Sequence, residues 1–148
     1  MDGFDEGWVA FKRAAGPLLV AEIGAQSPIG DGANDPTAGT LAASHSARDG
    51  DGGRLEIIST DQRGPIATYV IRGTRPHPID PVNATVLHWV GPEGDVFARH
   101  VEHPGTAPNP YNQRAWEARR AEVVGLFKAT VGTHMVLALL SPWRNRKI

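Results

Sequence analysis

A chain of 148 residues with 41% hydrophobic and 21% charged residues has the composition of an ordinary globular protein, and it is long enough to bury a core. A formal net charge of −1 gives no overall electrostatic attraction to nucleic acid or to an anionic membrane. The lack of cysteine in the sequence excludes disulfides, thiolate metal sites and a cysteine nucleophile.

The N-terminal segment has the residue pattern of a helix with one buried face. Apolar residues recur there at spacings of three and four, at Phe4, Trp8, Phe11, Ala15, Leu18 and Leu19. Gly16-Pro17 predicts an interruption near residue 15, followed by a second helix or a kinked continuation to about Gln26. The chain starts with acidic residues and has no apolar run near 18 residues, so we expect neither an export signal nor a membrane span.

The middle of the chain alternates apolar runs with glycine and proline, which is typical of short strands joined by turns. Strands are expected at residues 41–48, 54–60 and 66–72, the last because of its β-branched and aromatic residues. Residues 73–81 contain three prolines and are expected to form an extended loop, because proline removes a ladder donor. The first two of these strands are expected to form one hairpin, and residues 84–90 and 96–102 a second.

From Tyr111 the pattern becomes helical again, after Asn109 as a plausible cap and Pro110 at the first helical position. Trp116 and Phe127 fall on the apolar stripe and are expected to be core anchors that hold this helix to the sheet. Ser141-Pro142 predicts its end.

The predicted fold class is therefore α+β. We expect a mostly antiparallel sheet of about five strands, with an N-terminal helix and a long C-terminal helix packed on one face. The chain is expected to form a single domain over residues 1–148, with a core at about 5–131 and a C-terminal extension at about 132–148.

Candidate chemistry is sparse. His100, Glu102 and His103 could form half of a metal site on a helix, but residues three apart on a strand point to opposite faces. Ser44 and Ser46 lack the Gly-x-Ser-x-Gly setting of a hydrolase nucleophile. We expect no catalytic residue, metal or cofactor; a small His-dependent metal hydrolase is the enzymatic alternative, and a nucleic-acid-binding module is disfavoured by the net charge.

Several short motifs occur in a fixed order between residues 36 and 111. They read Pro36-Thr37-Ala38-Gly39-Thr40-Leu41-Ala42-Ala43-Ser44, Tyr69-Val70-Ile71-Arg72-Gly73-Thr74, His77-Pro78-Ile79-Asp80-Pro81, then Leu87 and Trp89 in a strand, Val101-Glu102-His103-Pro104-Gly105, and Asn109-Pro110-Tyr111. This order resembles the neck, or tail-completion, proteins of long-tailed bacteriophages (siphophages), over about residues 5–131. The first motif departs from the family pattern by one inserted or shifted residue, and Arg72 stands where the family usually has an acid.

The resemblance implies a non-enzymatic virion protein without a cofactor. It implies that about six copies form a ring at the head–tail junction, assembled in the host cytoplasm, through which DNA passes without being read. The implied partners are other copies of the chain, a head-closure (stopper) protein, and a tail terminator or tail-tube protein. A tail terminator that caps the tail tube is the close alternative function.

The loops at residues 73–81 and 103–109 are expected to lie at subunit contacts, because they are stiff and long and have no chemistry to perform. The basic C-terminal tail is expected to contact a neighbouring subunit or ring, because Trp143 is a large apolar side chain among cations. The expected interface residues are Arg72, Gly73, Thr74, His77, Ile79, Pro81, His103, Pro104, Gly105, Trp143, Arg144 and Arg146. On this hypothesis, Gly73→Val leaves the monomer folded and weakens ring formation.

Overall fold

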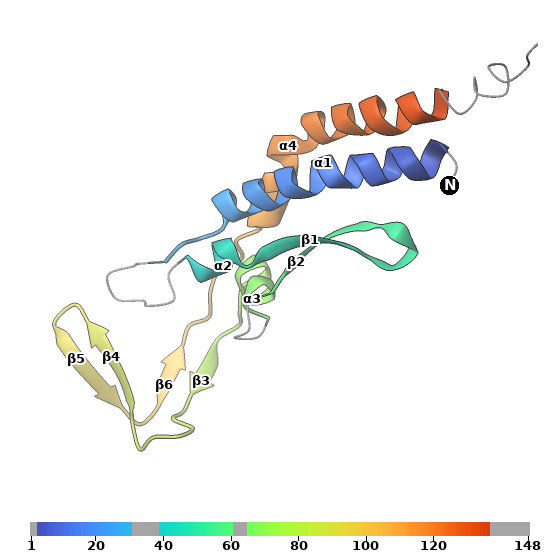
Figure 1. The fold of residues 1–148 in the computed structure, drawn as a ribbon. Helices are drawn as coiled ribbons and strands as arrows, with labels where there is room; N and C mark the ends of the chain where they lie inside the picture. Colours follow the sequence, from blue (N-terminus) through green and yellow to red (C-terminus); the bar gives the residue numbers. More distant parts are fainter. Residues whose placement is uncertain (1–2, 31–38, 61–64, 137–148) are drawn as a thin grey trace, which may run out of the picture.

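The computed structural model describes residues 3–30, 39–60 and 65–136. Two long helices, α1 (Gly3–Gln26) and α4 (Tyr111–Phe127), lie side by side and antiparallel along the upper part of the molecule (Figure 1). The hairpin of β1 (His45–Asp49) and β2 (Leu55–Ser59) packs against α1. These elements form the helical body of the protein.

The core of the body consists of two clusters along the contact between the long helices. One cluster contains Phe11, Ala15, Leu19, Val123 and Val131, and the other contains Ile23, Leu41, Tyr111 and Ala115. Both clusters join residues about a hundred positions apart in the sequence, so closing α1 on α4 is what creates the core.

The helix α1 is continuous to Gln26, so of the two predicted alternatives a separate second helix after Gly16-Pro17 is wrong and a continuation of the first helix is found. Pro17 lies inside the helix, where it cannot donate the hydrogen bond to the residue four positions earlier. Gly16 lets β1 approach closely, since a Cβ built there would lie 3.0 Å from the Ala47 Cβ. Packing against α4 and β1 holds the helix together where its own backbone is weakest.

The α+β fold class is confirmed, but the strands do not form one sheet. They form three separate antiparallel pairs, β1–β2, β3 (His77–Ile79) with β6 (Val101–His103), and β4 (Leu87–Gly91) with β5 (Gly94–Ala98). The last two pairs project below the body in Figure 1, and we call residues 74–106 the β-arm. The long helices pack on each other, and α1 also packs on β1–β2, so they do not cover one face of a five-stranded sheet.

Two segments expected as strands contain helix. Residues 40–43 form the short α2 (Thr40–Ala43), and residues 66–72 form α3 (Ile66–Arg72). In α3 the apolar residues Ile66, Ala67, Val70 and Ile71 all pack against the second core cluster. Their spacing places them on one helical face, and this burial outweighs the preference of β-branched residues for strands.

The end of α4 changes its winding. Residues 128–132 form a π-helix, η2 (Lys128–Gly132), before the chain returns to α-helix up to Val136. The wider turn rotates the side chains that follow, and it brings Val131 into the first core cluster. No helix among the described residues is long and apolar enough to cross a membrane.

The core role expected for Trp116 is wrong. Its side chain is 43% exposed and belongs to neither core cluster, because the buried face of α4 runs through Tyr111, Ala115 and Val123. Phe127 is 41% exposed, although the edge of its ring contacts Phe11 at a centroid distance of 5.5 Å. Phe127 therefore borders the core without being enclosed by it.

Core truncation should separate these positions. Phe11→Ala is expected to lower the free energy of unfolding by about 3–5 kcal/mol, because Phe11 is buried between α1 and α4. Trp116→Ala is expected to lower it by less than about 1 kcal/mol, because that ring is already in contact with solvent. Denaturant melts of the two variants measure the difference, and equal losses would contradict the assignment of the buried face.

Candidate functional site

Two Gly-Thr pairs cross where the β-arm leaves the body. Thr74 and Thr106 form an isolated antiparallel bridge, in which each backbone N–H donates to the other's carbonyl oxygen at 3.1 Å. Their hydroxyl oxygens lie 3.2 Å apart. The crossing brings together Gly73, Thr74 and Gly105, three residues expected at a subunit interface, within one chain.

Glycine is required on both sides of this crossing. Gly73 and Gly105 have φ values of +70° and +83°, in the left-handed region that favours glycine. A Cβ at Gly73 would collide with the carbonyl oxygen of Thr106, and one at Gly105 would collide with that of Thr74. Gly73→Val is therefore expected to open the crossing, and whether the rest of the monomer stays folded while ring formation weakens remains a prediction.

Below the crossing, the segment expected as a loop at residues 73–81 contains strand β3. His77 pairs with His103, with ring centroids 5.0 Å apart, and Ile79 pairs with Val101. Pro78 is tolerated because both strands of a two-stranded ribbon are edge strands, where a missing donor need not break a ladder. The expected interface residues His77, Ile79 and His103 are thus neighbours in the ribbon.

The remaining expected interface residues are more scattered. Arg72 ends α3, Pro81 follows β3 and Pro104 follows β6. Gly73, Thr74 and His77 line a shallow pocket together with the half-exposed ring of Tyr69. Trp143, Arg144 and Arg146 lie outside the described residues, so their expected contacts stay a prediction.

His100 is held between two carboxylates of the β-arm. Its Nδ1 lies 2.8 Å from an oxygen of Asp80, and its Nε2 lies 2.9 Å from an oxygen of Glu102. Both ring nitrogens can donate only when the imidazole is protonated, so these bonds, that to Asp80 first, raise the pKa of His100. At low pH this cluster ties the two strands of the β3–β6 ribbon together near their ends.

The residues of the hypothetical metal hydrolase do not converge. His103 lies beside His77 and accepts a hydrogen bond of 3.0 Å from the Gly105 N–H, while His100 bonds Asp80 and Glu102. In the described part of the chain, no group of three or more His, Asp or Glu side chains is arranged to hold a metal ion. His100 and Glu102 therefore meet in a hydrogen bond, while His103 lies apart from them beside His77.

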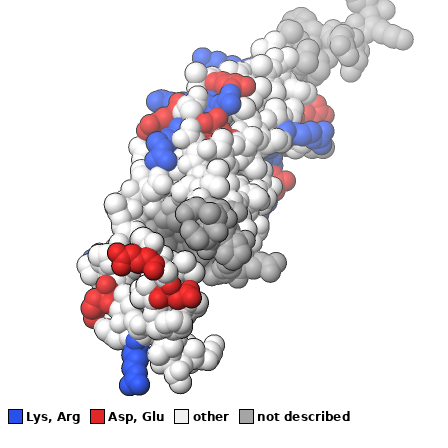
Figure 2. All heavy atoms as spheres, turned by 90° about the vertical axis from the view of Figure 1, so that its left-hand side faces the viewer, with Lys and Arg blue, Asp and Glu red and all other residues white. Residues whose placement is uncertain are grey.

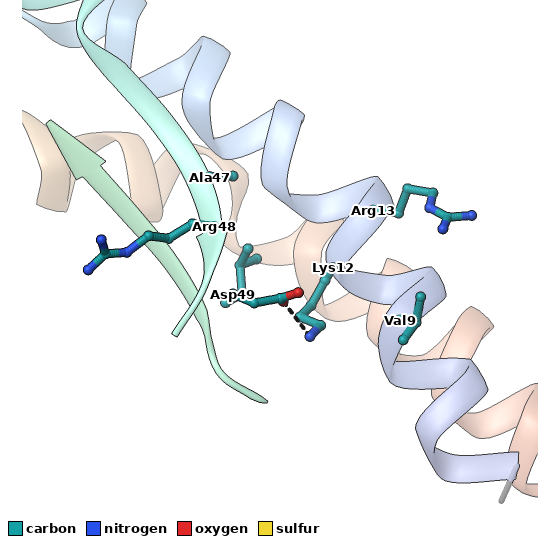
Figure 3. Close-up of a pocket in the computed structure, with 7 residues that line it drawn as sticks. Val9, Lys12, Arg13, Ala47, Arg48 and Asp49 are labelled. Carbon is teal, nitrogen blue, oxygen red and sulfur yellow. Dashed lines mark hydrogen bonds and ion pairs between the residues drawn. The ribbon is translucent and has the colours of Figure 1, made fainter. Parts of the chain in front are cut away.

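A pocket on the body lies between α1 and β1 (Figure 3). The Lys12 ammonium forms an ion pair with the Asp49 carboxylate across it, and the two arginines on its rim, Arg13 and Arg48, point away from it. Its only close charge pair is thus already joined. The pocket has the lining of a packing groove, with no nucleophile beside a general base.

The β4–β5 hairpin carries a group of exposed apolar side chains that the sequence reasoning missed. Phe97 is 64% exposed, Val90 is 61% exposed, and Trp89 is 42% exposed. The signal was present, since the adjacent apolar pairs Trp89-Val90 and Val96-Phe97 break the alternation of a strand with one wet face. Apolar residues on both faces predict that at least one face needs a cover.

Charge is unevenly shared between the β-arm and the body. The arm has four acidic residues against two arginines, namely Asp80, Glu93, Asp95, Glu102, Arg75 and Arg99. Figure 2 shows acidic side chains grouped over the lower lobe, which is the arm, and acidic and basic side chains interspersed on the body above it. The arm is therefore an acidic and partly apolar projection.

Comparison with protein-family models, with curated proteins and with solved structures finds no match for the chain.

The two-glycine crossing can be tested against a matched glycine. Gly52→Ala is expected to destabilise by about 1 kcal/mol, because Gly52 has φ of +69° but open space around its Cβ position. Gly105→Ala adds a backbone collision and is expected to open the crossing. Hydrogen exchange should then show lost protection at the Thr74 and Thr106 amides, with α1 and α4 unchanged. Retained protection at both amides would contradict the requirement for glycine.

The His100 cluster predicts a pH dependence. Because the folded-state pKa of His100 is raised above the unfolded value of about 6.5, its contribution to arm stability is complete below that value. It is lost as the pH rises through the raised pKa. An NMR titration of the ring should show that Asp80→Asn lowers this pKa, whereas Asp51→Asn on the other side of the molecule leaves it unchanged. Equal titration of His100 in all three proteins would rule out the cluster.

Proposed function

We propose that the chain is a structural, non-enzymatic subunit of the neck of a long-tailed bacteriophage, which assembles into a ring and joins the head to the tail. The observation that carries this proposal is the β-arm. Its two ribbons pack chiefly on themselves, and its hairpin exposes Trp89, Val90 and Phe97. A two-stranded hairpin is marginally stable alone in water, so an arm of this kind is expected to gain its stability from another protein surface.

The motif order supplies the second support. The motifs that resemble neck proteins coincide with structural junctions: Gly73-Thr74 forms one side of the crossing, and Gly105 flanks the other. Tyr111, from the Asn-Pro-aromatic motif, is 1% exposed in the second core cluster. The fold itself constrains the residues at such positions. A motif order that resembles that of neck proteins is therefore stronger support at these positions than it would be in free loops.

The ring, its copy number of about six, and the head-closure and tail partners come from the resemblance. A chain that carries two different contact surfaces forms head-to-tail contacts, and such contacts close into a ring when the rotation between copies permits. In this proposal DNA passes through the ring without sequence readout. The acidic arm suits contact with protein better than contact with phosphate.

The test is inactivation of the gene in the phage that encodes the chain. Separate heads and separate tails are expected by electron microscopy, and supply of the wild-type protein from a plasmid should restore joined particles. Phe11→Ala supplied in the same way should restore fewer particles, because it weakens the fold itself. Joined, infectious particles in the complete absence of the protein would refute the proposed function.

A further inference from the structure

The helix α4 carries a second apolar surface that faces solvent. Trp116, Val124 and Phe127 are each more than 40% exposed, and Arg120 lies between them. At 3.6 residues per turn these four positions fall on one stripe, next to the face that buries Ala115 and Val123. We call these four residues the α4 stripe.

The α4 stripe is not a misplaced part of the core. An undistorted helix would turn Val131 towards the same side as Phe127, four residues before it. The π-helical turn at Lys128–Gly132 instead directs Val131 into the core. Phe127 borders the core through ring contacts with Phe11 and Trp8, and the rest of the stripe lies on the exposed side of α4.

The β4–β5 hairpin presents a face of matching chemistry. His88 pairs with Phe97 and Val90 pairs with Asp95, so these four side chains share one face of the ribbon. Phe97 and Val90 are the two most exposed apolar side chains of the hairpin. His88 stacks on the Phe97 ring at 4.6 Å and forms an ion pair with Asp95 at 3.0 Å, which holds the face in a defined arrangement.

The two surfaces lie at opposite ends of the molecule. Figure 1 shows the hairpin at the lower left and α4 at the upper right, and β4 and β5 contact chiefly each other. One chain cannot join its own hairpin to its own α4 without unfolding the arm.

Their charges are complementary. The hairpin carries Glu93 and Asp95 and no lysine or arginine. On α4, Arg120 and Lys128 make no ion pair with any described residue, whereas Arg119 is already bound by Glu22 and Glu122. The acid nearest the stripe, Glu117, accepts a hydrogen bond from Gln113. Oppositely charged surfaces steer association and select the register of a contact.

We infer that the occupant of the α4 stripe is a second copy of this chain, whose β4–β5 hairpin lies along the stripe with Val90 and Phe97 against Trp116, Val124 and Phe127. This inference rests on the proposed function, and it names the subunit contact of the ring. Each copy gives its hairpin to one neighbour and receives a hairpin from the other. The contact is head-to-tail, so it can be repeated without limit until the ring closes.

The natural lack of cysteine allows a direct test by crosslinking. A chain with both Val90→Cys and Val124→Cys, treated with a short bismaleimide, should give a ladder of covalent dimers, trimers and larger species. Each single-cysteine chain can give dimers at most. The matched control pairs Val82→Cys with Val124→Cys, because Val82 is 90% exposed on the arm but lies outside the hairpin.

The outcomes are distinct. A ladder from the first pair, absent from the Val82 control, supports the contact. The contact is overturned if no species larger than dimers forms, or if both pairs give equal ladders. Arg120→Cys or Lys128→Cys in place of Val124→Cys tests whether the contact is shifted by one helical turn. If these pairs fail while the wild-type gene still restores head–tail joining, the proposed function stands and this contact alone is refuted.

Charge reversal gives an independent check on the same contact. Arg120→Glu in the Val90→Cys/Val124→Cys chain is expected to reduce species larger than dimers about tenfold, because the acidic hairpin then meets an acidic helix. Adding Glu93→Lys should restore the ladder, because it reverses a charge of the hairpin turn and leaves the His88–Asp95 ion pair in place. Circular dichroism of each variant confirms that the helices remain folded. A folded double-charge variant without recovery would contradict the pairing of these two surfaces.

Discussion

The reciprocal crossing of Gly73-Thr74 with Gly105-Thr106 determines the arrangement of the rest of this structure. Two glycines with positive φ let the two backbones approach until each threonine N–H reaches the other's carbonyl oxygen. The chain between them must then leave and return as an antiparallel ribbon, which places His77 beside His103. The thirty or so residues in between therefore project from the body in place of extending its sheet.

That projection explains why apolar side chains remain exposed. Burial of the hairpin would require contact with α1 or α4, and the crossing holds it away from both. The protein consequently has a core built by the closure of two helices and two apolar surfaces outside that core, on the hairpin and on α4. Exposed apolar surfaces of this kind are suited to contact with another protein surface, which is the basis of the proposed function.

Several ionisable groups of the described residues join one segment of the chain to another. Glu22, whose pKa is lowered by the hydrogen bond from Gln26 and then by Arg119, links α1 to α4. His100 links the two sides of the arm through Asp80 and Glu102, and Lys12 joins Asp49 across the groove beside α1. Each of these charges is used in holding one segment to another, and none is placed beside a nucleophile.

The sequence by itself determined the α+β class, the helical segments near both ends of the described chain, and the hairpins around residues 50–53 and 91–94, because periodicity and turn residues are local signals. It could not decide that residues 66–72 are helical, that Trp116 faces solvent, or that residues 73–81 pair with 101–106. Those outcomes depend on partners far away in the chain: the second core cluster selects a helix for α3, and packing against α1 decides which stripe of α4 is buried. Only tertiary structure brings Gly73 to Gly105, and it does so because each lacks the Cβ that would have kept the two backbones apart.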